Sequence, residues 1–332
     1  MLGNRLKILG DYFFNIGKEI FPSTMVIELT NHCNLRCPMC PHQKMKRGKG
    51  FMPESLYRRI IDQAAGRVEV IALHFLGESL IHPRCPEFVA YAANKGITTY
   101  LSTNGTLLDT EKARALFAAG LAYLLIDFDG DGKESYEEIR LNANYEKVLH
   151  NIKTAVAVQR EIRERSGVKT VITLQTIIFP GQARNLRRRF TSDELKYVQI
   201  REKPFSDTFN SDEKIIGHRR GCFIPWYQMT IAWDGTVPLC CVDYDCRVPV
   251  GNMNTSSIKE IWNNPGAGGV RRLREKHRRI DYQDIPMCNS CGVPNTGYFN
   301  PFFVLLSLLA GFRFTRFAMA YGEKFLALLR KR

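Results

Sequence analysis

Three cysteines in the first part of the chain are spaced for metal chemistry. Cys33, Cys37 and Cys40 form a C-x3-C-x2-C pattern on a short loop that follows an apolar, strand-like run. Three thiolates cannot satisfy all four irons of a cubane cluster, so such a site would leave one iron open to a ligand that is not protein. A zinc ion would need a fourth nitrogen or sulfur ligand, which His32 or His42 would supply. From the residues alone, a cluster with one open iron, a zinc site and simple buried thiols all remain open.

Alternating strands and helices must position this loop. Apolar, β-branched runs are separated by amphipathic segments, which is typical of a parallel sheet whose ligand loops lie at the C-terminal ends of its strands. The expected strands are 25–29, 68–75, 97–102, 123–128, 168–178 and 197–200. The expected helices are 53–65, 86–94, 109–119 and 145–165. The sequence thus predicts an α/β fold, although this alternation does not distinguish a barrel from an open sheet.

Composition and pattern divide the chain into four parts. An amphipathic helix that ends at Pro22 precedes the alternating region, and the pattern changes within a polar loop at 201–217. The predicted parts are an N-terminal helix at 1–24, a strand–helix domain at 25–205, a cysteine-rich domain at 206–299 and a basic amphipathic tail at 300–332.

The overall composition narrows the class of protein. With 332 residues and 45% hydrophobic content, the chain can bury a large core. Ten cysteines are too few for a disulfide-rich scaffold, and their spacing favours metal or iron–sulfur ligation in a reducing cytoplasm. The net charge of +14 suits a partner-facing surface, nucleic acid or an anionic membrane. A zinc-binding nucleic-acid or scaffold protein is the non-enzyme alternative, but the strand–helix units do not suit it, and we expect no nucleic-acid partner.

The cysteine loop gives a family resemblance. A C-x3-C-x2-C loop directly after a strand is the signature of the radical S-adenosylmethionine (radical SAM) enzymes, and this segment resembles that family. The resemblance implies a partial (β/α)6 TIM-like barrel and a [4Fe-4S] cluster whose open iron binds SAM. One electron from this cluster would cleave SAM to a 5′-deoxyadenosyl radical, which abstracts a substrate hydrogen. An electron donor such as flavodoxin or ferredoxin is then implied.

Loops after the other strands extend the resemblance. The loop FLGES after the second strand is similar to the family's Gly-Gly-Glu-Pro loop, with Leu for the first Gly and Ser for the Pro. There Gly77 would allow close backbone approach, and Glu78 would accept from the SAM ammonium. The turn that begins at Ser102 and includes Asn104 matches the family's Ser/Thr-x-Asn-Gly turn, whose hydroxyl and amide would meet SAM or substrate. Arg140 occupies a position where relatives place an arginine near the SAM carboxylate. Each of these residues has a purely structural alternative.

The cysteine-rich region resembles the SPASM/twitch extensions of the same family. An Asp-Gly pair predicts a hairpin between two strand-like runs at 231–241, and a Gly-Asn pair, a short helix and a C-x2-C pair follow. The resemblance implies one auxiliary [4Fe-4S] cluster of the twitch type, because no cysteine follows Cys291. Its expected ligands are Cys222, Cys240, Cys288 and Cys291. Cys241 or Cys246 could replace Cys240, and a zinc ribbon with four cysteine ligands is the alternative.

These features together predict a reaction class. A fully ligated auxiliary cluster has no open position for substrate but can accept an electron from a substrate radical. We therefore expect two-electron oxidation of a small-molecule alcohol similar to a sugar or cyclitol, as in twitch-type cyclitol dehydrogenases. Asp243 or Asp127 would take the hydroxyl proton, with Arg247 as a further candidate. A peptide- or protein-modifying SPASM maturase is the alternative, although the 24 residues before the barrel are too few for a peptide-recognition domain.

The C-terminal tail at 300–332 bears on where in the cell the protein acts. The uncharged run 302–312 is too short to span a bilayer. The basic amphipathic segment after it can pack on the flank of the barrel, which we prefer, or lie in a membrane interface. We expect a cytoplasmic protein, with peripheral membrane contact through the tail as the alternative.

Overall fold

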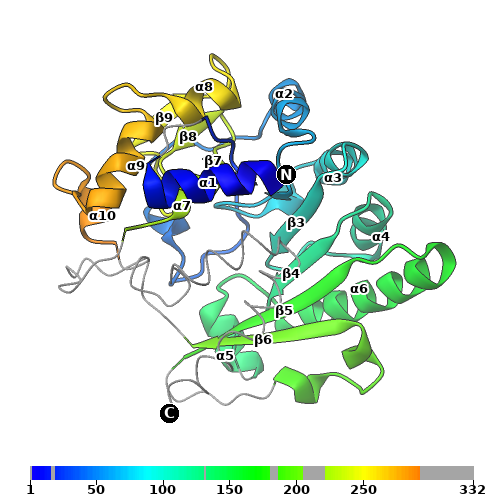
Figure 1. The fold of residues 1–332 in the computed structure, drawn as a ribbon. Helices are drawn as coiled ribbons and strands as arrows, with labels where there is room; N and C mark the ends of the chain where they lie inside the picture. The colour runs from blue at the N-terminus through cyan, green and yellow to red at the C-terminus, as the bar shows by residue number, and fades with distance from the viewer. Residues whose placement is uncertain (1, 16–18, 131, 180–185, 205–220, 292–332) are drawn as a thin grey trace, which may run out of the picture.

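A seven-stranded parallel sheet forms the centre of the molecule (Figure 1). The computed structural model describes residues 2–15, 19–130, 132–179, 186–204 and 221–291. The strand order is β6-β5-β4-β3-β2-β1-β7, so the first six strands follow one another across the sheet in chain order. The strands are β1 (Thr24–Ile27), β2 (Val70–Ala72), β3 (Thr98–Thr103), β4 (Tyr123–Asp127), β5 (Val171–Ile178), β6 (Val198–Pro204) and β7 (Gln228–Ile231).

Helices between the strands cover one side of this sheet (Figure 1). They are α2 (Glu54–Ala64), α3 (Cys85–Asn94), α4 (Thr110–Ala118), α5 (Lys133–Ile139) and α6 (Tyr145–Ser166). Their buried faces pack on the strand residues that point outward, such as Met25, Ile71 and Leu101. The predicted α/β fold is confirmed, and every strand and helix expected between residues 25 and 200 is present. The short helix α5 was not expected.

The seventh strand departs from the expected hairpin. β7 pairs in parallel with β1, with Met25 opposite Met229 and Ile27 opposite Ile231. The Asp-Gly turn exists, with Gly235 at φ +88°, but it leads from the large sheet into β8 (Thr236–Pro238). The antiparallel pair is β8 with β9 (Pro249–Asn252). The expected hairpin across 231–241 is thus limited to its turn, which a 2.8 Å backbone hydrogen bond from Ala232 N–H to Thr236 O closes, because the apolar β7 pairs with β1 in the main sheet.

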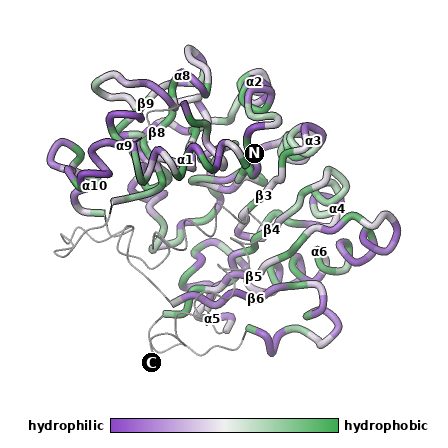
Figure 2. Tube along the Cα trace, in the orientation of Figure 1, coloured by the Kyte–Doolittle hydropathy of each residue, from purple (hydrophilic) through white to green (hydrophobic). Residues whose placement is uncertain are grey.

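The N-terminal helix and the C-terminal helices lie at the β7 end of the sheet (Figure 1). Helix α1 (Leu2–Phe14) is shorter than the expected helix, since Asn15 has φ +51°. The buried Asp11 accepts a 2.9 Å hydrogen bond from Trp226 Nε1. Trp226 lies in the short helix α7 (Ile224–Tyr227). The remaining helices are α8 (Ile258–Asn263), α9 (Val270–Arg279), which is mainly hydrophilic in Figure 2, and α10 (Pro286–Asn289).

Two predictions from the sequence concern residues that the structure does not describe. The tail at 300–332 lies outside the described residues, as do the expected domain boundaries at 205–206 and 299–300. Among the residues that the structure does describe, no helix combines the length and the apolar character that crossing a membrane requires.

Candidate functional site

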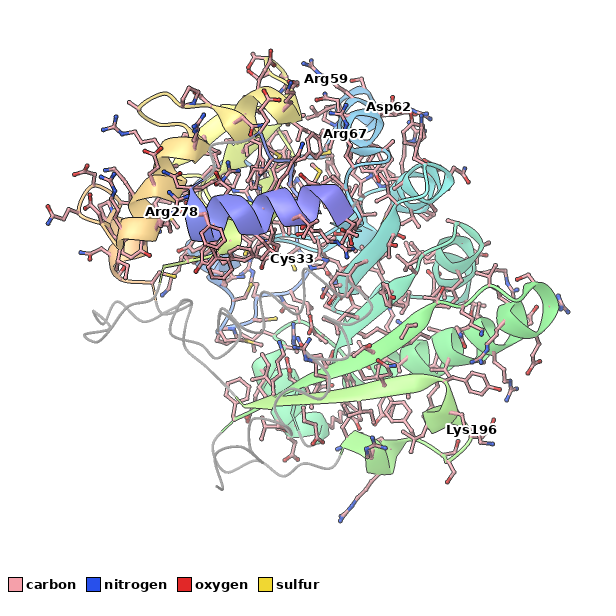
Figure 3. All side chains as sticks on the ribbon, in the orientation of Figure 1. Cys33, Arg59, Asp62, Arg67, Lys196 and Arg278 are labelled. Atoms are coloured by element: carbon pink, nitrogen blue, oxygen red, sulfur yellow. The ribbon has the colours of Figure 1, made fainter. Side chains whose placement is uncertain are left out.

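The C-x3-C-x2-C loop leaves the C-terminal end of β1 and brings its three thiols into one environment. Cys40 N–H donates to Cys37 O at 3.0 Å, and Cys33 Sγ accepts from Leu35 N–H at 3.5 Å. Burial, together with the negative charges of Glu78 and of the Cys37 and Cys40 thiolates, raises the pKa of Cys33 to about 11. In Figure 3, Cys33 lies toward the middle of the view, whereas Lys196 is at the outer edge beside β6. The three cysteines are thus grouped, as their spacing predicts.

An ion pair lies against this cysteine loop. Arg140 Nε and Nη2 donate to Asp129 Oδ2 at 2.7 and 2.5 Å, and the Asp129 side chain is fully buried. The remaining Arg140 nitrogen, Nη1, lies 3.9 Å from Cys37 Sγ. Arg140 therefore lies beside the cysteine loop. Two of its five N–H donors are directed to Asp129.

Gly77 allows the loop after β2 to touch the start of the cysteine loop. It has φ +95°, and a Cβ there would lie 2.7–2.8 Å from backbone atoms of Asn31 and His32. The next residue, Glu78, donates its backbone N–H to His32 O at 2.8 Å. No side chain larger than hydrogen fits this approach, so the structure has the close backbone contact that the sequence suggested for this glycine.

Glu78 organises the turn after β3. Its buried carboxylate accepts hydrogen bonds from Thr103 Oγ1 at 2.8 Å, Asn104 N–H at 2.7 Å and Leu80 N–H at 3.1 Å. The Asn104 side chain in turn donates to Asn34 Oδ1, within the cysteine loop, at 3.0 Å. Glu78 and Asn104 therefore tie the loops after β2 and β3 to the cysteine loop. Their contact with SAM stays a prediction.

A row of polar side chains runs across the inner face of the sheet, opposite the helices. In register order across β4, β5 and β6, Asp127 faces Gln175 and Gln175 faces Arg201. Asp127 Oδ1 accepts from Gln175 Nε2 at 3.0 Å, and Asp127 Oδ2 accepts from Ser102 Oγ at 3.3 Å. The row continues to His74, whose Nδ1 accepts from Ser102 N–H at 3.1 Å. Ser102 and Asp127, both predicted site residues, are thus brought together.

His74 is an uncharged member of this row at neutral pH. Burial lowers the pKa of His74 to about 4, although the negative charge of Asp127 opposes this shift. Because Nδ1 accepts a hydrogen bond from a backbone amide, the proton of the neutral ring is assigned to Nε2. The charged members of the row are therefore Asp127 and Arg201.

A buried ion pair joins the first cysteine loop to the second cysteine region. Arg47 donates to both carboxylate oxygens of Glu28, at 2.6 and 2.5 Å, and the Glu28 side chain is fully buried. Arg47 Nε also donates to Tyr244 O at 2.5 Å. Glu28 accepts further bonds from Leu76 N–H and Trp233 N–H. We call Glu28 and Arg47 the junction pair, since residues from distant parts of the chain meet there.

Four cysteines from three distant segments line one pocket beside α7 and α9. They are Cys222, Cys240, Cys288 and Cys291. Burial, together with the charges of Cys291 and Cys241, raises the pKa of Cys222 to about 12. The other lining residues are largely apolar and include Ile224, Leu239 and Met287. His277 Nε2 lies 3.5 Å from Cys288 Sγ.

The two surplus cysteines are placed differently. Cys241 adjoins the four thiols but does not line their pocket. The electrostatic neighbours of Cys246 are Arg47, Asp243, Glu28 and Asp234, so it faces the junction pair. The arrangement thus favours Cys240 over Cys246 as a member of the quartet.

Asp243 is fully buried in the loop between β8 and β9. Its Oδ1 accepts from Arg247 N–H and its Oδ2 from Val248 N–H, both at 2.8 Å. These bonds close the loop on itself, which is a structural role. Its predicted role as a proton acceptor remains a prediction, and the Arg247 side chain is largely exposed.

Neither cysteine group has the geometry of a single-ion site. Within the described parts of the chain, no group of three or more His, Cys, Asp or Glu side chains is arranged to hold one metal ion. The case for iron–sulfur clusters therefore rests on the grouping of the thiols together with the family of the chain.

Comparison with known proteins establishes that family. The model of the radical SAM superfamily matches residues 27–189, and the model of the SPASM iron-sulfur cluster-binding domain matches residues 222–292. The chain belongs to the radical SAM superfamily and carries a C-terminal SPASM domain. SAM, the cluster that binds it and an auxiliary iron-sulfur cluster follow from this membership. The grouped thiols of both regions fit these groups.

Relatives in this family have diverse activities. The chain is 34% identical over 107 residues to a tungsten-containing aldehyde ferredoxin oxidoreductase cofactor-modifying protein of Pyrococcus furiosus. The matched segment covers 32% of this chain and 30% of that protein. The chain is also 34% identical over 111 residues to a PqqA peptide cyclase of Rhodopseudomonas palustris, and this match covers 33% of this chain and 29% of that protein. The chain thus matches only about three tenths of the length of these relatives.

A solved structure shares the fold over most of the chain. It is BtrN in complex with AdoMet and 2-DOIA, with a TM-score of 0.58 and 17% identity, covering 83% of this chain and 94% of that one. At this identity the likeness concerns the fold.

Several residues of the site escaped the sequence analysis. His74, Gln175 and Arg201 follow from strand alternation once the register is known, since each shares a face with Asp127 or its neighbours. The junction pair had no local signal, because its two residues lie 19 positions apart and are brought together by the loop between them.

Proposed function

We propose that this protein oxidises a secondary alcohol on a small polar molecule, with Asp127 as the acceptor of the hydroxyl proton. When bound, the SAM cluster with SAM supplies a hydrogen-atom acceptor, and the auxiliary cluster supplies a one-electron acceptor. Conversion of an alcohol to a ketone releases one hydrogen atom from carbon, one electron and the hydroxyl proton. A residue of the chain is therefore needed to take that proton.

Asp127 is better suited to this role than Asp243. It stands at the C-terminal end of β4 on the inner face, and each of its oxygens accepts a single side-chain hydrogen bond, from Gln175 or Ser102. Both oxygens of Asp243 accept backbone N–H groups of their own loop, and its side chain is fully buried. A base needs a free lone pair within reach of the substrate.

The observation that carries this proposal is the polar row on the inner face. His74 follows β2, and Ser102, Asp127 and Gln175 lie on β3, β4 and β5, so polar side chains from four neighbouring segments meet on this face. Hydroxyl, amide, imidazole and carboxylate groups together can hydrogen-bond a ligand rich in hydroxyl groups. This supports a polyol such as a sugar or cyclitol.

A peptide substrate is the second candidate. The similarity to a PqqA peptide cyclase favours it, since that relative is named for action on a peptide. The same row would then receive a polar side chain of the peptide.

Isotope transfer would test the proposal. Reconstituted protein with SAM and a reductant would be incubated with cyclitols and hexoses that carry deuterium on their carbinol carbons. We expect deuterium in 5′-deoxyadenosine and a ketone product. Asp127→Asn should keep SAM cleavage but lose the ketone, while the exposed control Asp193→Asn should keep both. Deuterium transfer from a labelled peptide and from none of the polyols would favour the second candidate, and unchanged ketone formation in Asp127→Asn would remove Asp127 from the mechanism.

A further inference from the structure

Strand β6 adds positive charge to the inner face of the sheet. Arg201 is the register partner of Gln175, and Lys203 is the partner of Ile177. Ile200, which directly precedes Arg201, packs against the hydrophobic core and therefore lies on the opposite, outward face. Because side chains alternate along a strand, Arg201 and Lys203 share the inner face with Asp127.

Arg201 differs from the other two arginines near this face. Arg47 and Arg140 are each engaged by a buried carboxylate, Glu28 and Asp129 respectively. For the portion of the chain that the structure describes, no carboxylate forms an ion pair with Arg201. Burial raises the pKa of Tyr100 on β3, and the positive charge of Arg201 opposes this rise across the inner face. Among the described residues, Arg201 is thus a guanidinium with no carboxylate as its ion-pair partner.

Gln175 lies between this charge and Asp127 and has an unmatched acceptor. Its Nε2 donates to Asp127, but its Oε1 is buried without a hydrogen-bond partner. Buried polar atoms are nearly always satisfied in native proteins, so an unsatisfied acceptor beside a binding face indicates a donor that belongs to a ligand.

We propose, building on the alcohol oxidation proposed above, that the substrate is an anionic polyol whose oxyanion is bound by Arg201. One of its hydroxyl groups donates to Gln175 Oε1, and the hydroxyl that is oxidised lies against Asp127. Asp127 and Arg201 are two strands apart at one register level, which separates their Cα atoms by about 10 Å. Both side chains point inward, so this span suits a single sugar or cyclitol ring with one phosphate or carboxylate group.

Anion binding to the reconstituted enzyme in the presence of SAM tests this proposal without turnover. Inorganic phosphate and acetate would be titrated separately by calorimetry at constant ionic strength. We expect saturable binding of one of them, weakened about tenfold or more in Arg201→Gln, because charge-assisted bonds to a guanidinium are strong. Arg201→Lys should recover part of the affinity. The exposed control Arg165→Gln, at the end of α6, should bind like the wild type.

The outcomes are distinct. Tighter binding of phosphate points to a phosphorylated polyol, and tighter binding of acetate points to a sugar acid. Absence of saturable binding of either anion up to about 50 mM, far above a millimolar dissociation constant, would overturn the proposal, as would equal affinities in the wild type and Arg201→Gln. This experiment measures binding and no product. A finding that Asp127 is not the proton acceptor would therefore not affect its result, and failure of anion binding would not exclude alcohol oxidation.

Discussion

The two cysteine regions are built in opposite ways. Cys33, Cys37 and Cys40 come from one loop after one strand, so their grouping depends on local sequence. The quartet that includes Cys222 and Cys291 is assembled from three segments, which β8, β9, α8 and α9 separate along the chain. A short motif therefore suffices to identify the first site, whereas the second exists only through the tertiary fold.

The surroundings of the two regions differ as well. The first loop adjoins carboxylates and polar turns, including Glu78 and the Asp129–Arg140 pair. The quartet lies among apolar side chains such as Ile224, Leu239 and Met287. A polar border suits a site that must bind SAM and substrate, and an apolar shell suits a group that exchanges only electrons, because such a shell controls solvent access.

The junction pair connects the regions and gives the largest expected effect. Arg47→Met would leave Glu28 as a buried, unpaired charge and should lower the free energy of unfolding by about 3–5 kcal/mol. The double variant Glu28→Gln/Arg47→Met should be less destabilised than the sum of the single variants. Urea denaturation measures all three, and additive effects would show that the pair does not couple the two regions.

The contact at Gly77 comes next. Gly77→Ala should lower the free energy of unfolding by about 2–4 kcal/mol, since it combines backbone strain at positive φ with a clash against Asn31 and His32. Gly66 is a matched control: it has φ +71°, but a Cβ there would meet nothing within 4 Å. Gly66→Ala should cost about 1 kcal/mol. Equal losses in the two variants would mean that the approach of the two loops is not required.

The neutral His74 predicts a smaller, pH-dependent effect. The pKa of His74 is depressed from 6.5 to about 4 in the folded protein, so its contribution to stability is present above pH 6.5 and is lost as the pH falls toward 4. Between pH 7 and pH 5 the wild type should lose about 1–2 kcal/mol more than His74→Gln. Thermal denaturation across this range provides the measurement, and parallel curves for the two proteins would contradict a buried neutral imidazole.

The smallest effect is expected at the surplus cysteine near the junction pair. Cys246→Ser should leave the iron content unchanged, because Cys246 faces Arg47 and Glu28 rather than the quartet. Cys240→Ser, the matched change within the quartet, should lower the iron content. Loss of iron in Cys246→Ser would assign that cysteine to the auxiliary site.

The sequence predicted much of the fold because the spacing of apolar residues along a segment indicates which of its faces is buried. This spacing is clear over several residues in the helices α2, α3, α4 and α6 and in the first six strands. Strand β7 was misread because its short apolar run precedes an Asp-Gly pair, which indicates a turn but not the partner strand. The placement of Glu28 against Arg47, and of Arg201 on the inner face, depends on register and loop paths that no local pattern encodes.

Iron content and SAM cleavage together test the central claim that two separate sites have separate roles. One variant would carry alanine at Cys33, Cys37 and Cys40, and the other at Cys222, Cys240, Cys288 and Cys291. The wild type should hold about eight irons after reconstitution, and each variant about four. The first variant should form no 5′-deoxyadenosine, and the second should still form it but release no oxidised product. SAM cleavage by the first variant, or its loss in the second with four irons retained, would contradict the account.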